Sequence, residues 1–164
     1  MYQHIVHPFP PICDNRSKIL ILGTLPSVKS RETDFYYGHK QNRFWKVLAA
    51  VCKSSVPKSV EEKKALLLQN HIALWDAVLS CDIKGSSDSS IKNVVPTDLQ
   101  RILSNSEVIQ IYANGVKAGQ LYKKYQEQDI GREITVLPST SPANAVWTLE
   151  RLIESWSVIE RYIP

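Results

Sequence analysis

The chain has 164 residues, of which 43% are hydrophobic and 22% are charged. This composition is ordinary for one globular domain and excludes a disordered or fibrous chain. The formal net charge of +4 is compatible with a polyanionic partner, although many globular proteins carry such a charge without one. No apolar run is long enough to cross a membrane, and the N-terminus lacks a signal-peptide pattern. We therefore expect a cytoplasmic protein without membrane association.

The first part of the chain predicts one buried strand and two helices. Prolines within residues 8–11 exclude a helix there, and we expect this segment to lie across the surface of the domain. Residues 18–23 form a continuous apolar run that ends in glycine, which predicts a central strand covered on both faces. A polar and aromatic loop follows over residues 24–41, and apolar spacing predicts a helix over residues 42–52. A capping box at residues 59–62 predicts the start of the next helix.

The middle of the chain continues to alternate between strands and helices. Residues 72–79 contain a second short strand, and residues 84–90 form a polar loop. A capping box at residues 97–100 predicts another helix. Residues 108–113 predict a third strand, and residues 116–126 predict the helix that follows it.

The last part of the chain predicts a fourth strand and a final helix. The strand covers residues 133–137, and Ser141 is placed to cap the helix, with Pro142 at its first position. Strands that alternate with helices imply parallel pairing and right-handed crossovers. The sequence therefore predicts one α/β domain over residues 1–164, a three-layer sandwich with a central four-stranded parallel sheet flanked by helices.

The three cysteines, Cys13, Cys52 and Cys81, are widely spaced. Neither a C-x-x-C nor an H-x-x-x-H pattern occurs, so the usual ligand spacing of a structural zinc ion is missing. We therefore expect reduced, mostly buried thiols and no metal site.

Two loops rich in proline and serine follow the first and the fourth predicted strands, at residues 23–27 and 137–144. Open parallel sheets bind their ligands outside the carboxyl ends of the strands. Both loops combine rigid prolines with hydroxyls and free backbone N–H groups, which suits the binding of phosphate groups. The alternative is that Pro26 and Pro142 only shape the connections and that Ser141 only caps a helix.

The most unusual segment, residues 31–45, places aromatic side chains beside amides and a glycine. Rings that can stack and polar groups that can read an edge are typical of a pocket for a flat heterocycle. The alternative is structural: Phe44 and Trp45 belong to a helix core, and Asn42 is an N-cap. His39 by itself also fits an exposed or structural histidine.

Several common catalytic motifs are absent from the sequence. It contains no GxxxxGK[ST] phosphate loop, no GxGxxG dinucleotide fingerprint and no GxSxG nucleophile elbow. A pair of carboxylates for sugar hydrolysis is not evident near the two loops, and Asp76 and Asp82 are the nearest candidates. We therefore expect no nucleoside triphosphate, dinucleotide or serine-nucleophile chemistry.

Two segments together resemble the uracil-DNA glycosylase superfamily, and within it most closely the hypoxanthine-DNA (deoxyinosine) glycosylase branch. They are GTLPSVKSRETDFYYGHKQNRFWKVL, which begins at Gly23, and LPSTSPANA, which begins at Leu137. The similarity covers nearly the whole chain, including ALWDAVLSCDIKGSSDSSIKN, and the combination of GHKQNRFW with STSPAN is its specific part. It implies a four-stranded parallel sheet with helices on both faces, and a monofunctional glycosylase that needs no metal and no cofactor.

The resemblance also implies roles for individual residues. The catalytic residue would be Asn42, the asparagine of QNRFW. The base-binding pocket would consist of Gly23, Thr24, Leu25, Pro26, Tyr37, Gly38, His39, Asp76 and Asn114. The loop that binds and intercalates into DNA would contain Ser27, Pro138, Ser139, Thr140, Ser141, Pro142, Ala143 and Asn144.

Three positions depart from the pattern of the family. Many relatives carry Asn or Asp in the first loop, where this chain has Leu25. They often carry a histidine in the second loop, where this chain has residues 139–141, and Lys40 replaces a proline. Catalysis is therefore expected to depend on Asn42. An amide cannot take a proton at neutral pH, but it can hold a water molecule and polarise the site.

We therefore expect a DNA repair enzyme that hydrolyses the N-glycosidic bond of a flipped, deaminated base and leaves an abasic site. Hypoxanthine is the first expected base and uracil the second. The partner would be double-stranded or single-stranded DNA that contains such a base, bound by a monomer. Two alternatives remain open. A DNA- or nucleotide-binding module without catalysis would bind DNA in a salt-dependent way without an abasic product. A small-molecule nucleosidase would cleave free inosine.

Overall fold

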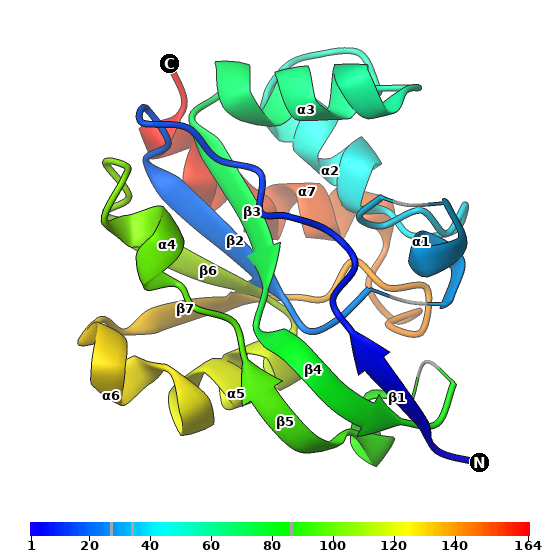
Figure 1. Ribbon diagram of the computed structural model, residues 1–164. Helices are drawn as coiled ribbons and strands as arrows, with labels where there is room; N and C mark the ends of the chain where they lie inside the picture. The colour runs from blue at the N-terminus through cyan, green and yellow to red at the C-terminus, as the bar shows by residue number, and fades with distance from the viewer. Residues whose placement is uncertain (27, 34, 86) are drawn as a thin grey trace.

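The computed structural model describes residues 1–26, 28–33, 35–85 and 87–164. Its centre is a sheet in the order β3-β2-β6-β7, made of β2 (Ile19–Gly23), β3 (Ile72–Asp76), β6 (Gln110–Asn114) and β7 (Ile134–Leu137). All neighbouring strands are parallel, which confirms the predicted four-stranded sheet (Figure 1). Every residue of β2 and β3 is buried, as expected for strands covered on both faces.

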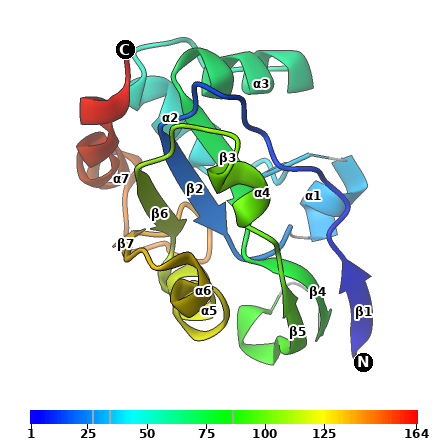
Figure 2. The same cartoon turned by 60° about the vertical axis from the view of Figure 1, so that its left-hand side comes forward.

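Helices cover both faces of this sheet, which confirms the predicted three-layer sandwich (Figures 1 and 2). One face carries α2 (Phe44–Val51), α3 (Val60–Gln69), α7 (Leu149–Trp156) and the adjoining η2 (Ser157–Tyr162). The other face carries α4 (Gln100–Leu103), α5 (Val116–Tyr125) and α6 (Glu127–Ile130). The short α1 (Val28–Thr33) lies in the connection between β2 and α2. No helix in the described ranges has the length and apolar character needed to cross a membrane.

A second sheet, antiparallel and in the order β1-β4-β5, departs from the sequence prediction. It consists of β1 (Gln3–Val6), β4 (Val78–Ile83) and β5 (Lys92–Pro96), with η1 (Asp88–Ser90) before β5. Ala77 alone separates β3 from β4, and the chain passes from one sheet to the other at this residue. Because the apolar run continues over residues 72–79, the sequence pattern does not reveal this change of sheet. The N-terminal prolines follow β1, where the chain crosses to a bridge between Ile12 and Leu74.

Of the two predicted capping boxes, one is confirmed and one is wrong. Ser59 caps α3, since its Oγ accepts a hydrogen bond from the Glu62 N–H at 3.1 Å. The hydroxyl of Thr97 instead donates to the backbone oxygen of Asp76 at 2.7 Å, and helix α4 begins only at Gln100. Burial of Thr97 against the end of β3 therefore replaces the expected cap.

The start predicted for the last helix is also wrong. Helix α7 begins at Leu149, and its N-cap is Thr148, whose Oγ1 accepts from the Arg151 N–H at 3.2 Å. Ser141 therefore caps no helix, and residues 138–147 form a long loop with turns between β7 and α7. Contacts from Arg43, described below, hold this loop in a non-helical shape.

Candidate active site

A cavity of about 170 Å³ lies where the strands of the parallel sheet end. Gly23 of β2, Asp76 of β3 and Asn114 of β6 line it, and the loop after β7 closes one side. Open parallel sheets bind ligands at this edge. Pockets that bind drug-sized ligands measure roughly 300–1,000 Å³, so this smaller cavity suits one planar ring system. The lining residues are Gly23, Thr24, Leu25, Pro26, Ser30, Tyr36, Tyr37, Asn42, Asp76, Ile83, Asp88, Asn114, Ser139, Thr140 and Ser141.

Asn42 enters the cavity from the residues just before α2, with its amide held in one orientation. Its Oδ1 accepts a hydrogen bond from the Phe44 N–H at 3.0 Å and a second from the Thr140 hydroxyl at 2.9 Å. A backbone N–H can only donate, so the atom that faces Phe44 must be the amide oxygen. Two donors occupy this oxygen, and the Nδ2 group of Asn42 is the part left to interact with a ligand.

Thr140 connects Asn42 to the end of β6. Its hydroxyl donates to Asn42 and accepts a hydrogen bond from Asn114 Nδ2 at 3.0 Å. Its backbone N–H donates to Asn114 Oδ1, also at 3.0 Å. Thr140 is fully buried, so each of these polar groups depends on its partner within the protein. The network therefore fixes two amides of the cavity relative to the loop after β7.

Arg43 clamps the loop after β7 through its backbone carbonyls. The guanidinium donates from Nη2 to the oxygens of Ser141 at 2.8 Å and Asn144 at 3.1 Å, and from Nη1 to the oxygen of Trp147. The backbone N–H of Arg43 donates to the oxygen of Thr140 at 3.1 Å. The planar fork of arginine supplies several donors in fixed directions, which suits a loop that presents several carbonyls to one point.

The backbone N–H groups of this loop differ from the expectation that they are free. Those of Ser141 and Ala143 donate to the hydroxyls of Ser139 and Ser141, at 3.1 and 3.2 Å. That of Asn144 donates to the Ser141 oxygen at 3.0 Å. The serines therefore stabilise the turn itself, as serine commonly does in loops.

Tyr37 lines the cavity with a ring that has support on one face. It stacks on Phe44, with a distance of 4.1 Å between ring centroids and an angle of 22°. Its backbone is left-handed, with φ of 54°, which is uncommon for a residue other than glycine. The hydroxyl is buried, and the side chain of Asn114 lies close to it. Burial, and then the nearby Asp76, raise the pKa of this phenol, so it stays neutral.

A carboxylate and a histidine meet beneath the cavity. His7 Nε2 and Asp76 Oδ2 are 2.7 Å apart, and both side chains are buried. Gly23 lies against this carboxylate. A Cβ on Gly23 would stand 2.3 Å from Asp76 Oδ1 and 2.7 Å from the Tyr37 hydroxyl oxygen. The absence of a side chain at Gly23 therefore lets Asp76 and Tyr37 approach β2.

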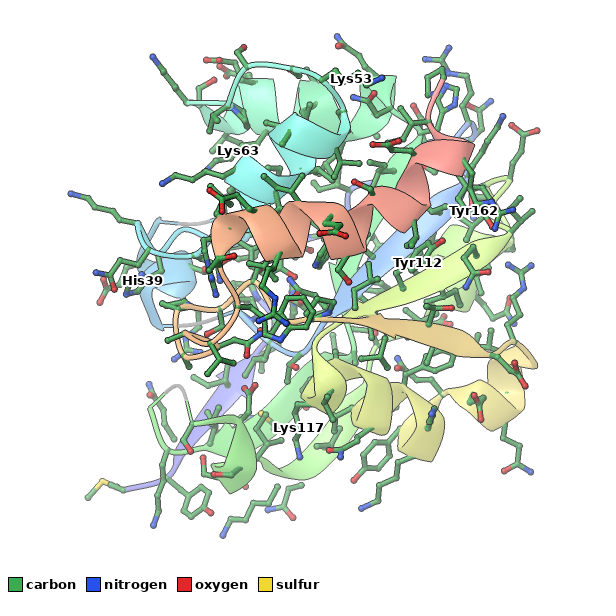
Figure 3. The ribbon with its side chains drawn as sticks, turned by 180° about the vertical axis from the view of Figure 1, so that it is seen from behind. His39, Lys53, Lys63, Tyr112, Lys117 and Tyr162 are labelled. Carbon is green, nitrogen blue, oxygen red and sulfur yellow. The ribbon has the colours of Figure 1, made fainter. Side chains whose placement is uncertain are left out.

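The structure brings most of the predicted site residues to this cavity, but not all of them. Gly38 and His39 are not among its lining residues, and the position expected for His39 needs correction. His39 is exposed on the side of the molecule that carries α1 (Figure 3), and its Nδ1 accepts from the Gln41 N–H at 3.0 Å. Pro138, Ala143 and Asn144 line a neighbouring groove together with Trp147, and Pro142 lines neither hollow. The predicted Ser27 lies outside the described residues.

Sequence reasoning missed four residues that line the cavity, Ser30, Tyr36, Ile83 and Asp88. It also missed two residues that support the site from outside the cavity, His7 and Arg43. His7 precedes the prolines of the N-terminal segment, which the sequence predicts to lie across the surface of the domain. Its partner, Asp76, is 69 residues away in the sequence. Arg43 lies inside the QNRFW motif, where a basic residue could as well face solvent. The sequence around His7 and around Arg43 does not indicate which distant residues these two side chains contact.

Comparison with known proteins places this geometry in a family. The family described as the Uracil DNA glycosylase superfamily matches residues 10–160. The chain is 33% identical over 156 residues to a protein of Methanosarcina acetivorans named hypoxanthine DNA glycosylase, covering 94% of this chain and 97% of that protein. A protein of the same name from Methanosarcina barkeri is 30% identical over 138 residues, 83% of this chain and 86% of the relative.

A solved structure agrees with these matches. The solution NMR structure of a candidate uracil DNA glycosylase from Methanosarcina acetivorans superposes with a TM-score of 0.80 at 32% sequence identity. The superposition covers 99% of this chain and 98% of that one, so it includes both sheets and the cavity. The chain therefore belongs to the uracil DNA glycosylase superfamily.

Proposed function

We propose that this chain is a monofunctional DNA glycosylase that removes a deaminated base, hypoxanthine first and uracil second. The observation that carries the proposal is the small cavity at the strand ends, where hydrogen bonds fix the amide of Asn42. The names of the two relatives support the same activity. Water adds to C1′ of the sugar while the bond from C1′ to the base nitrogen breaks. The electron pair of that bond leaves with the base, and the proton released by the water ends on the base, which leaves an abasic site and the neutral free base.

The cavity accepts a base only after the base has left the DNA helix. Extruding a nucleotide costs a few kcal/mol, and less when the base is mispaired, which favours damaged positions. The ring of Tyr37, supported by Phe44, offers a stacking surface for the extruded base. The groove beside the cavity shares Asp88, Ser139 and Ser141 with it, and we assign this groove to the DNA next to the extruded nucleotide.

Asn42 acts in this proposal as a hydrogen-bond donor. Its oxygen already accepts two hydrogen bonds, so Nδ2 donates either to the departing base or to the oxygen of the attacking water. A donor aimed at the negative charge that develops on the departing base typically contributes about 10²–10³-fold. Leu25 adds no polar group to the wall of the cavity, so this donation carries more of the reaction. The enzyme acts as a monomer and uses no metal or cofactor.

The test is a single-turnover assay with enzyme in excess over duplexes that contain deoxyinosine, deoxyuridine or deoxyxanthosine. We expect an abasic site in the deoxyinosine duplex first and in the deoxyuridine duplex second, detected by strand cleavage at alkaline pH. A duplex with undamaged adenine at the same position is the control. The proposal is overturned if none of the three duplexes yields an abasic site.

A second candidate, a DNA-binding module without catalysis, is favoured by Leu25, which gives the first loop of the cavity an apolar side chain in place of a catalytic group. It predicts DNA binding that weakens with salt and an intact glycosidic bond after long incubation. The assay above separates the two functions, because only a glycosylase converts the bound duplex to an abasic product.

Replacing Thr140 with valine is expected to weaken both the fold and the reaction. Valine keeps the shape but leaves Asn114 Nδ2 without its acceptor and Asn42 Oδ1 without one of its donors. We expect a loss of about 1–3 kcal/mol in the free energy of unfolding, measured with denaturant. Thr140→Ser keeps the hydroxyl and is the matched control. Equal excision rates for the valine and serine variants would contradict the role of the network.

A further inference from the structure

The hydrogen-bonded pair formed by His7 and Asp76 is more buried than the other histidine–aspartate pair of the described residues, His4 and Asp82. The two side chains are 1% and 4% exposed, and 2.7 Å separates Nε2 from Oδ2. His7 is surrounded by Phe9, Tyr36 and Trp75, with ring centroids 5.7, 5.8 and 6.5 Å away. A buried carboxylate is unfavourable unless it is paired and hydrogen-bonded. Within the described ranges, His7 is the one basic side chain within 4.0 Å of this carboxylate.

The hydrogen bonds determine which nitrogen of His7 carries the proton. The backbone N–H of Phe9 donates to Nδ1 at 3.2 Å, so Nδ1 must present a lone pair. The proton then lies on Nε2, which donates to Asp76 Oδ2. The imidazole is therefore neutral, with its N–H directed at Asp76 Oδ2. Such orientation of one side chain by a second is common in functional sites.

The second carboxylate oxygen, Oδ1, lies on the side of Gly23 and Tyr37, which both line the cavity. The backbone of Asp76 is fixed as well, because its oxygen accepts from the Thr97 hydroxyl at 2.7 Å. The next residue, Ala77, donates its N–H to the oxygen of Gly23 at 2.7 Å. These contacts hold the carboxylate in place from its backbone and from Oδ2.

We infer that His7 is a positioning residue that turns Oδ1 of Asp76 toward the cavity, where it accepts a hydrogen bond from the ring N–H of a lactam base. This inference rests on the proposed function and specifies what the cavity recognises. An ionised carboxylate can only accept hydrogen bonds, so the edge that meets Oδ1 must carry a donor.

This requirement separates deaminated bases from normal ones. Adenine N1 and cytosine N3 are bare acceptors, and each faces a carboxylate oxygen unfavourably. Deamination replaces the neighbouring amino group by a carbonyl and places a proton on that nitrogen, giving N1–H in hypoxanthine and N3–H in uracil. One acceptor therefore recognises the common product of both deaminations. A site built around such a contact strongly rejects the analogue that lacks it.

The test compares the binding of two uncleavable duplexes, one with 2′-fluoro-deoxyinosine and one with the 2′-fluoro nucleoside of unsubstituted purine, whose N1 is bare. We expect the wild-type protein to prefer the hypoxanthine duplex by about 10-fold or more. Asp76→Asn has the same shape, but Nε2–H of His7 still needs an acceptor, so the amide oxygen turns to His7 and its NH₂ turns to the cavity. We expect this variant to lose or reverse the preference.

Two further comparisons show that His7 acts through Asp76. His7→Leu removes the donor and should reduce the preference, whereas His7→Gln retains an N–H donor and should restore most of it. Asp82→Asn is the matched control, because Asp82 pairs with His4 at 2.9 Å on the exposed β1–β4 surface. A loss of folding weakens binding to both duplexes, so the ratio of the two dissociation constants reports recognition alone.

The inference is overturned if Asp76→Asn keeps the wild-type ratio, or if His7→Gln is no better than His7→Leu. Failure of the proposed function would be seen in a different experiment. The wild-type protein would then release neither hypoxanthine nor uracil from the cleavable duplexes.

Discussion

Replacing Asn42 with alanine is expected to lower the single-turnover rate of hypoxanthine excision by about 10³-fold while DNA binding persists. The variant loses the Nδ2 donor in the cavity, and one such donor contributes about 10²–10³-fold. It also loses the acceptor for the Phe44 N–H and for the Thr140 hydroxyl. We therefore expect a second, smaller effect, a loss of about 1 kcal/mol in the free energy of unfolding.

The variant Asn42→Asp separates these two effects. A carboxylate still accepts from Phe44 and Thr140, so stability should stay near that of the wild type. It presents an oxygen instead of the NH₂ group to the cavity, so excision should be as low as in the alanine variant. Excision equal to or faster than wild type in Asn42→Asp would contradict donation by the amide. It would indicate that the reaction needs an acceptor for the proton of water.

Replacing Gly23 with alanine is expected to lower excision by about 100-fold. The new Cβ would stand 2.3 Å from Asp76 Oδ1 and 2.7 Å from the Tyr37 hydroxyl oxygen. His7 holds the carboxylate and Phe44 supports the ring, so neither can yield without leaving its place. A displacement of about 1 Å at a reacting centre can cost about 10²-fold in rate. A single-turnover assay measures the excision rate, and a melting curve of the same sample measures the stability of the fold.

Gly131→Ala is the control for adding a methyl group to a glycine. Gly131 ends α6 with a φ of 75°, and a Cβ there meets nothing within 4 Å. The left-handed backbone disfavours alanine by about 1–2 kcal/mol, so this variant should lose stability and keep its excision rate. The Gly23 variant should in contrast lose its excision rate, because its Cβ meets Asp76 and Tyr37. Parallel losses of stability and rate in both variants would contradict a specific role for the space above Gly23.

The central sheet could be predicted because its strands are short runs rich in apolar residues, separated by segments with helical patterns. That pattern also pointed to the loops after the first and fourth strands as ligand sites. The structure adds that Asp76 and Asn114 are the last residues of β3 and β6, beside Gly23 at the end of β2. The role expected for Asn42 came from the resemblance of QNRFW to a family motif. The structure adds what a motif cannot contain, namely which atom of the amide faces the cavity.

The parts that could not be predicted depend on contacts between distant segments. Whether residues 72–79 form one strand or two is decided by β1, which pairs with β4 but lies some seventy residues earlier. Helix α7 starts late because Arg43 holds carbonyls about a hundred residues away. Local propensity placed Ser141 and Pro142 at a helix start, and tertiary contacts decided otherwise.

The contacts that build the cavity are among the longest in the chain. His7 meets Asp76 across 69 residues, and Asn42 meets Thr140 across 98. Closing such loops is entropically costly, and contacts of this kind form together with the rest of the fold. We therefore expect the site to form cooperatively with the rest of the fold, because the residues that build it come from distant segments. Its activity should therefore disappear in the same transition as the global structure, and it can serve as a sensitive measure of the folded fraction.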